Sequence, residues 1–245
     1  MVIYDFGANK GQNLEYFLSK GYKVVAVEAN RLLCDNIERK FSVAISENNL
    51  KVINCCLSET EDNKIVDFYI HKTNSVLSQF AVPSHDIITE FKKIQVISKK
   101  PSTIIKENGF PYYIKIDIEH YDLNVLRELM SSRVLPKYIS VEAHHPEVLD
   151  LLIKNKHFVS FNAVRGATVH KLYKKFDSHS AGPFGNDIIS PWLDKEGISS
   201  LFKMIKFGWI DIHASTIEVF PKANIKLQYY MGKVARIKHF IKTKF

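Results

Sequence analysis

Two acidic residues that follow short apolar runs are the side chains best placed to bind a small molecule. Asp5 ends the run VIYD and opens the loop DFGANKG, and Glu28 ends the next run 23 residues later. Gly7 and Gly11 let the loop turn sharply and come close to a ligand. The helix expected after the loop adds unpaired amide groups and a partial positive charge.

The pair of acids indicates what the ligand is. An acid about 20 residues beyond a glycine loop is placed to accept hydrogen bonds from ribose hydroxyls. Asp5 would hold a free amino group and would repel a pyrophosphate. S-adenosylmethionine carries an amino acid and a ribose, so it fits both acids. Two alternatives stay open: an NAD(P)-dependent Rossmann oxidoreductase, although the third glycine of its fingerprint is missing, and a non-catalytic binding module on a degenerate fold.

A second polar group follows the later apolar runs YYIKIDIE and YISVEAH. Ligands bind beyond the carboxyl ends of parallel strands, so Asp117, His120, Glu142 and His144 are the candidate catalytic residues. If the ligand is S-adenosylmethionine and the acceptor of its methyl group is a hydroxyl, the transfer requires positioning of the hydroxyl and loss of its proton. Two mechanisms are open. In one, Asp117, Glu142 and His144 hold Mg²⁺ or Mn²⁺, which lowers the pKa of the hydroxyl. In the other, no metal is bound and the general base is His144 or His120.

Apolar runs and helical periodicity alternate along the chain, which predicts an α/β fold. Because the strands are continuously apolar, they indicate a parallel sheet covered on both faces. A last strand is expected at 209–213 or 216–220. The other predicted strands are 2–6, 23–30, 51–57, 65–71, 112–119, 138–144 and 157–164, and the predicted helices are 11–20, 31–47, 101–109, a segment from about 123 to 130, and 146–156.

These motifs resemble the FkbM family of methyltransferases. The matching segments are YDFGANKGQN, VVAVEAN, NCCLSETEDNKIVDFYI, YIKIDIEHYDLNVL and YISVEAH, in the expected order over residues 2–164. The resemblance implies a class I methyltransferase Rossmann-like fold, with a mostly parallel sheet, helices on both faces and an antiparallel C-terminal strand. It also implies O-methylation, commonly of sugar or polyketide hydroxyls. His120 stands where the family usually has glycine.

The loop and the resemblance together give the expected cofactor-binding residues. They are Asp5, Gly7, Ala8, Asn9, Gly11, Glu28, Ala29, Asn30, Ser58 and Asp117.

The stretch 177–191 is rich in Ser, Gly, Pro and Asn and predicts a long surface loop. It is either a lid over a polar substrate or an ordinary connector. Asn186, Trp192 and His213 are the candidate contacts to a sugar or glycan acceptor, since the face of a Trp ring commonly packs on sugars.

The charge is concentrated at the C-terminal end. Of a formal net charge of +8, residues 222–245 contribute seven Lys and Arg and no acid, so the rest of the chain is nearly neutral. We therefore expect a methyltransferase domain at 1–220 and a basic amphipathic helix at 221–245. The helix either packs on the domain or contacts a membrane peripherally. The neutral body argues against a nucleic-acid partner.

The remaining composition favours a cytoplasmic location. No apolar run reaches the ~20 residues of a membrane helix, and no secretory signal is recognisable at the N-terminus. Three cysteines without a spacing pattern, Cys34, Cys55 and Cys56, indicate free thiols in a reducing compartment.

Overall fold

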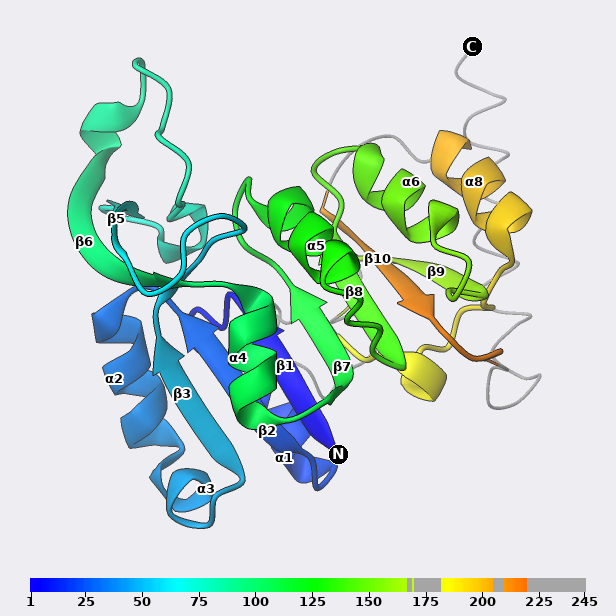
Figure 1. The fold of residues 1–245 in the computed structure, drawn as a ribbon, viewed down its shortest axis with the longest axis horizontal. Helices are drawn as coiled ribbons and strands as arrows, with labels where there is room; N and C mark the ends of the chain where they lie inside the picture. The colour runs from blue at the N-terminus through cyan, green and yellow to red at the C-terminus, as the bar shows by residue number, and fades with distance from the viewer. Residues whose placement is uncertain (167–168, 170–181, 205–208, 220–245) are drawn as a thin grey trace.

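A computed structural model describes residues 1–166, 169, 182–204 and 209–219, and a twisted sheet lies at their centre (Figure 1). Within these residues the sheet has seven strands in the order β3-β2-β1-β7-β8-β10-β9. The strands are β1 (Val2–Phe6), β2 (Lys23–Glu28), β3 (Leu50–Asn54), β7 (Pro111–Ile116), β8 (Tyr138–Glu142), β9 (Ser160–Arg165) and β10 (Ile210–Ser215).

The pairing of the strands confirms the predicted fold class. β1 pairs in parallel with β2 and β7, and the parallel order continues through β3 and β8. β10 is antiparallel to both of its neighbours, β8 and β9. β2 and β3 lie on one side of β1, and β7 and β8 lie on its other side, so the strand order reverses direction between β1 and β7. The carboxyl ends of β1 and β7 therefore form a topological switch point, where ligands bind in such sheets.

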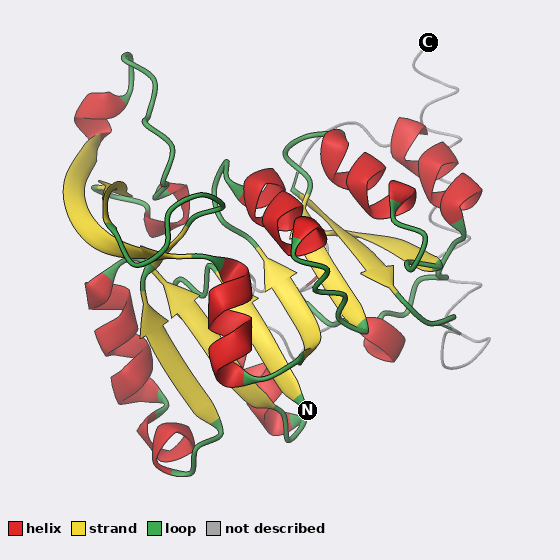
Figure 2. Cartoon of the chain, in the orientation of Figure 1, coloured by secondary structure: helices red, strands yellow, loops and turns green. Residues whose placement is uncertain are grey.

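Helices cover both faces of the sheet (Figure 2). Buried apolar side chains of α4, α5, α6 and α8 pack against one face, and those of α1 and α2 pack against the other. The helices are α1 (Leu14–Ser19), α2 (Arg31–Lys40), α3 (Ser42–Ser46), α4 (Pro101–Asn108), α5 (Asp122–Ser131), α6 (Glu147–Lys154) and α8 (Lys195–Met204).

A small second sheet, in the order β4-β6-β5, lies beyond the carboxyl end of β3. It consists of β4 (Cys56–Leu57), β5 (Ile65–His71) and β6 (Phe91–Lys99). β5 and β6 form a long antiparallel pair that projects from the body in Figure 1. Their connection contains two short 3-10 helices, η1 (Ser75–Leu77) and η2 (Ile88–Glu90). A third, η3 (Gly185–Asp187), lies in a later loop.

Several element boundaries differ from those predicted. The helix expected at 31–47 divides at Phe41, and the strand expected at 51–57 breaks at Cys55, where the chain leaves the main sheet for the small one. The last strand, β10, matches the predicted range 209–213 rather than 216–220. Neither β6 nor α8 was predicted. The three cysteines are buried free thiols, as expected.

The predicted basic helix at 221–245 lies outside the described residues, and so do residues 177–181 of the predicted loop. The division into two parts, the membrane contact and the cytoplasmic location therefore stay predictions. In the part of the chain that the structure describes, no helix combines the length and the apolar character needed to cross a bilayer.

The described part of the predicted loop packs against the sheet through an aromatic cluster. The ring of Phe184 stacks on Tyr113 with a centroid distance of 4.0 Å, and it also contacts Phe17 and Tyr138. Asp187 holds the segment to α1 through Lys20 at 2.5 Å. The segment therefore covers the α1 face of the sheet near the amino ends of β7 and β8.

We predict that Phe184→Ala lowers the free energy of unfolding by about 3–5 kcal/mol, because the substitution leaves a cavity in this cluster. Phe110→Ala is the control, since Phe110 is 69% exposed, and it should change stability by no more than about 0.5 kcal/mol. Urea unfolding measures both. Equal stabilities of the two variants would mean that Phe184 does not anchor the segment.

Candidate active site

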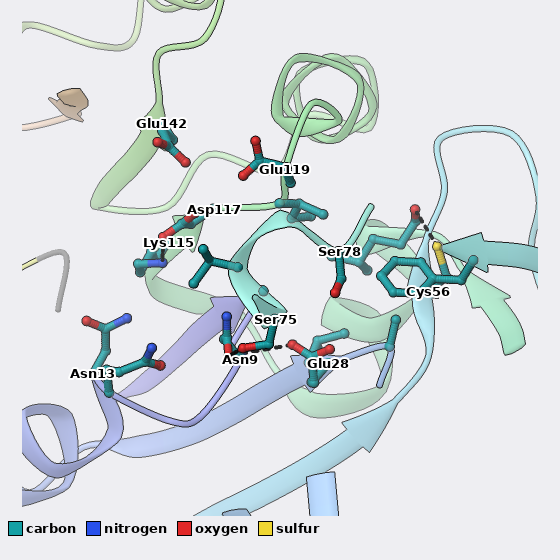
Figure 3. Close-up of a pocket in the computed structure, with 18 of the residues that line it drawn as sticks. Asn9, Asn13, Glu28, Cys56, Ser75, Ser78, Lys115, Asp117, Glu119 and Glu142 are labelled. Atoms are coloured by element: carbon teal, nitrogen blue, oxygen red, sulfur yellow. Dashed lines mark hydrogen bonds and ion pairs between the residues drawn. The ribbon is translucent and has the colours of Figure 1, made fainter. Parts of the chain in front are cut away.

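A cavity of about 210 Å³ opens at the switch point between β1 and β7 (Figure 3). Its walls come from the loop after β1, the end of β2, the region around β4, the η1 segment and the residues after β7 and β8. The residues that line it are Gly7, Asn9, Gln12, Asn13, Val27, Glu28, Ala29, Cys55, Cys56, Leu57, Phe68, Ser75, Val76, Ser78, Lys115, Asp117, Ile118, Glu119, Glu142 and Trp209.

The loop after β1 is held tightly between the neighbouring strands. The amides of Gly7 and Ala8 both donate to the carbonyl of Val27 at 3.0 Å, and the amide of Asp117 donates to the carbonyl of Phe6 at 3.0 Å. Gly7 has a φ of +85°, and a Cβ added there would lie 1.9 Å from the carbonyl oxygen of Asp117. Glycine is therefore required by the backbone conformation and also by the close approach of the strand that carries Asp117.

Glu28 lies at the floor of the cavity and organises the loop around it. Its Oε2 accepts from the amide of Asn9 at 2.9 Å, and its Oε1 accepts from the amide of Asn30 at 2.8 Å. Burial raises its pKa, although these amide hydrogen bonds lower it. Each carboxylate oxygen keeps a lone pair for a further donor.

The surroundings of Glu28 suit a nucleoside. The adjoining wall is apolar and consists of Ala29, Cys56, Leu57 and Phe68. Ser75 also lines the cavity, and its hydroxyl donates to Oδ1 of Asn9 at 3.0 Å. A base on the apolar wall and a ribose on the Glu28 carboxylate would both find matching chemistry. These observations fit S-adenosylmethionine.

Asp5 lies beneath the loop, fully buried, and is not among the residues that line the cavity. Its nearest charged partner is Lys115, with Nζ 3.8 Å from Oδ1. Burial raises the pKa of Asp5 to about 6, although the charge of Lys115 lowers it. Its direct contact with a ligand amino group stays a prediction.

Lys115 is the centre of a buried group of charges on the α1 face of the sheet. It is 2% exposed, and its Nζ donates to Oδ2 of Asp117 at 2.7 Å. Burial would lower its pKa, but the charges of Asp117, Asp5 and Asp211 raise it, so the ammonium stays protonated. A lysine is rarely this buried unless it is paired.

Two further acids, Glu142 and Asp211, lie near Asp117 and Lys115. Burial would raise the pKa of Asp117, but Lys115 and a hydrogen bond with Glu142 lower it. The pKa of Glu142 is raised by burial and then by the charge of Asp117. Asp211 stands opposite Glu142 in the β8–β10 pair, and burial and the charge of Asp117 raise its pKa too. The negative charge therefore resides on Asp117, next to the lysine.

The two candidate histidines lie beside acids and are not among the residues that line the cavity. Nδ1 of His144 is 3.3 Å from Oδ2 of Asp122, and its Nε2 is 3.6 Å from Oε1 of Glu142. Nε2 of His120 is 3.3 Å from Oε1 of Glu119, and the two histidine rings are 5.3 Å apart. The structure thus brings together all four residues predicted to be catalytic.

The remaining predicted cofactor residues, Ala8, Gly11, Asn30 and Ser58, do not line the cavity. Ala8 and Ser58 are buried, and Ser58 Oγ accepts from the amides of Thr60 and Glu61. A Cβ at Gly11 would meet Leu14, Ile37 and Phe41 at 2.9–3.3 Å. The side chain of Asn30 caps α2 by accepting from the amide of Leu32 at 3.1 Å.

The three predicted substrate residues do not reach the cavity. Asn186 is exposed in η3, and Trp192 packs against Tyr138 and His213 on the α1 face. His213 is buried, and burial lowers its pKa to about 3. Contact of these side chains with an acceptor stays a prediction.

Sequence reasoning missed four features of the site. Lys115 and Asp211 each interrupt an apolar strand, which was the available signal, since an unpaired charge is not stable there. Asp122 and the segment from Ser75 to Ser78 carry no such signal, because their places depend on contacts between distant parts of the chain.

Comparison with known proteins agrees with this geometry. The family described as the methyltransferase FkbM domain matches residues 5–164. No curated protein matches the sequence.

The solved structures that are similar to this chain include the following three methyltransferases. A precorrin-6y C5,15-methyltransferase from Geobacter metallireducens is 11% identical, with 87% of this chain and 78% of that chain covered and a TM-score of 0.38. The geranyl diphosphate C-methyltransferase from Streptomyces coelicolor is 11% identical, with 88% and 73% covered and a TM-score of 0.41. A SAM-dependent methyltransferase from Archaeoglobus fulgidus is 13% identical, with 87% and 85% covered and a TM-score of 0.40.

The family match carries the assignment, and the strand order and the cavity at the switch point agree with it. The chain therefore belongs to the FkbM family of S-adenosylmethionine-dependent methyltransferases.

Proposed function

We propose that this methyltransferase methylates a hydroxyl oxygen of a carbohydrate or glycoconjugate. The proposal rests on one observation, the acidic side chains at the end of the cavity that lies away from Glu28. There Asp117, Glu119 and Glu142 line the wall (Figure 3). Carboxylates accept hydrogen bonds from hydroxyl donors, and a sugar offers several neighbouring hydroxyls. Asp117 already has Lys115 at 2.7 Å, and Glu119 and Glu142 lie beside histidines, but all three side chains keep exposed surface that a hydroxylated acceptor can contact.

Each residue then has a defined task. S-adenosylmethionine supplies a methyl group bonded to a sulfonium. Glu28 accepts from the ribose hydroxyls, and the loop at Gly7 and Asn9 forms the floor beneath the cofactor. Asp117 accepts the hydrogen bond of the acceptor hydroxyl and orients it, since its charge is held by Lys115 at 2.7 Å. The oxygen–methyl bond forms as the sulfur–methyl bond breaks and S-adenosylhomocysteine leaves, and in a metal-free site His144 or His120 takes up the hydroxyl proton. Correct orientation of the acceptor is a large part of catalysis in a displacement of this kind.

Two parts of the proposal come from the sequence alone. Assistance by Mg²⁺ or Mn²⁺ bound to Asp117, Glu142 and His144 is one of them. The other is a lid formed by the loop at 177–191. An NAD(P)-dependent oxidoreductase is not favoured, because the family is one of methyltransferases.

For the cofactor, we predict that Glu28→Ala weakens the binding of S-adenosylhomocysteine by about 1.5–3 kcal/mol, or roughly 10- to 150-fold, through loss of hydrogen bonds to a charged group. Glu15→Ala on the exposed side of α1 is the control and should leave the affinity unchanged. Titration calorimetry gives both values. An unchanged affinity in the Glu28 variant would refute the ribose assignment.

For the acceptor, we predict transfer of a ¹³C-methyl group from labelled S-adenosylmethionine to a saccharide within a panel of mono- and oligosaccharides. NMR spectroscopy identifies the product, because the chemical shift of an O-methyl group differs from those of N- and C-methyl groups. Methylation of nitrogen or carbon acceptors alone, with none of the saccharides modified, would contradict the proposal.

We further predict that Asp117→Asn lowers kcat/KM for that saccharide by about 100-fold, since a neutral amide lacks the charge that orients the acceptor hydroxyl. Asp86→Asn, at an exposed position in the β5–β6 connection, is the matched control. Thermal unfolding should show that both variants remain folded. Full turnover in the Asp117 variant would remove this residue from the acceptor site.

A further inference from the structure

Two imidazoles lie close to one carboxylate, Glu119, which lines the cavity. Glu119 and His120 follow β7, and His144 follows β8. One ligand atom from each of the three residues lies within 4.8 Å of the other two. Nε2 of His120 is 3.3 Å and Nε2 of His144 is 3.8 Å from the same atom, Oε1 of Glu119. Both imidazoles therefore lie near the same carboxylate oxygen of Glu119.

A buried carboxylate behind His144 fixes the direction of its ring. Asp122 is 2% exposed, and its Oδ1 accepts from the amide of Ile118 at 2.7 Å. Its Oδ2 is 3.3 Å from Nδ1 of His144. When Nδ1 donates its proton to Asp122, the lone pair of Nε2 is on the side of Glu142 and Glu119, whose nearest oxygens are 3.6 Å and 3.8 Å away. Histidines that bind metals commonly have this carboxylate partner, which sets the tautomer and the ring orientation.

The backbone at His120 adds a second, independent observation. Its φ is +61°, in the left-handed region that glycine favours and that other residues occupy at a cost in free energy. Its side chain is 53% exposed, and the contacts of its ring are with Glu119 and with the ring of His144. Coordination of an ion by the ring would offset the backbone cost.

We propose that Glu119, His120 and His144 bind a divalent first-row transition-metal ion of the class that prefers imidazole ligands, such as Zn²⁺, Fe²⁺ or Co²⁺. Two histidines and one carboxylate leave coordination positions open for other oxygen ligands. A set of this composition favours such ions over Mg²⁺, which prefers oxygen ligands alone. The trio shares His144 with the set predicted from the sequence and replaces Asp117 and Glu142 by Glu119 and His120.

The ion would lie next to the acceptor. Glu119 and Glu142 line the cavity, and Nε2 of His144 is 3.6 Å from Oε1 of Glu142. The open positions would then be available to the acceptor oxygens. This role rests on the proposed function, whereas the binding of the ion does not.

The test measures metal binding by the full, tag-free chain after removal of metals with a chelator. Co²⁺ is added and followed by its visible absorption, and Zn²⁺ and Mg²⁺ are titrated by calorimetry. We expect one Co²⁺ or Zn²⁺ per chain, with Mg²⁺ bound at least about tenfold more weakly. His144→Ala and His120→Gly should each weaken the affinity for Co²⁺ by at least about tenfold, and Asp122→Asn by about 10- to 100-fold.

Two variants serve as controls. His145→Ala removes an exposed histidine adjacent to the site and should leave the affinity for Co²⁺ unchanged. His120→Gly suits the positive φ, so it should keep the fold or raise the unfolding temperature of the metal-free protein while losing the ion.

The inference is overturned if the chain binds neither Co²⁺ nor Zn²⁺, or if the His120→Gly and His144→Ala variants bind as tightly as the unaltered chain. No cofactor or acceptor is present in this assay. Metal binding without methylation of any saccharide would therefore contradict the proposed function alone, and saccharide methylation without metal binding would contradict this inference alone.

Discussion

The close approach of two strand ends is the constraint on which the site depends. A Cβ at Gly7 would lie 1.9 Å from the carbonyl oxygen of Asp117, so the loop after β1 and the end of β7 meet backbone to backbone. Hydrogen bonds from Gly7 and Ala8 to Val27, and from Asp117 to Phe6, bind three strand ends to one another. The floor of the cofactor cavity and the acids of the acceptor end are thereby held in one rigid unit.

Electrostatics imposes a second constraint within this unit. Lys115 is almost completely buried and lies between Asp5 and Asp117, with Asp211 close by. Burial raises the pKa values of Asp5, Asp211 and Glu142, and the charge of Asp117 raises them further, whereas Lys115 and a hydrogen bond with Glu142 lower the pKa of Asp117. The arrangement leaves one carboxylate ionised at the place where the cavity needs a hydrogen-bond acceptor.

The sequence predicted the fold and identified Glu28, Asp117 and Glu142, which line the cavity, because these signals are local. Continuous apolar runs marked the parallel strands, and the ends of those runs marked Glu28, Asp117 and His144. The roles of Lys115, Asp211 and Asp122 were missed because their partners come from distant parts of the chain. Asp211, for example, lies opposite Glu142 only because β10 pairs with β8. The segment at Ser75 was missed for the same reason, because the β5–β6 pair must fold before it reaches Asn9.

The most direct test of this account compares Gly7→Ala with Gly21→Ala. Both glycines have a positive φ, of +85° and +75°, but a Cβ at Gly21 meets nothing within 4 Å. The backbone cost is therefore shared, and the contact with Asp117 is the difference between the variants. We predict that Gly7→Ala weakens the affinity for S-adenosylhomocysteine at least about tenfold relative to Gly21→Ala, since a displacement costing about 1.4 kcal/mol has that effect. Equal affinities in the two folded variants would contradict the claim that the meeting of these strand ends shapes the site.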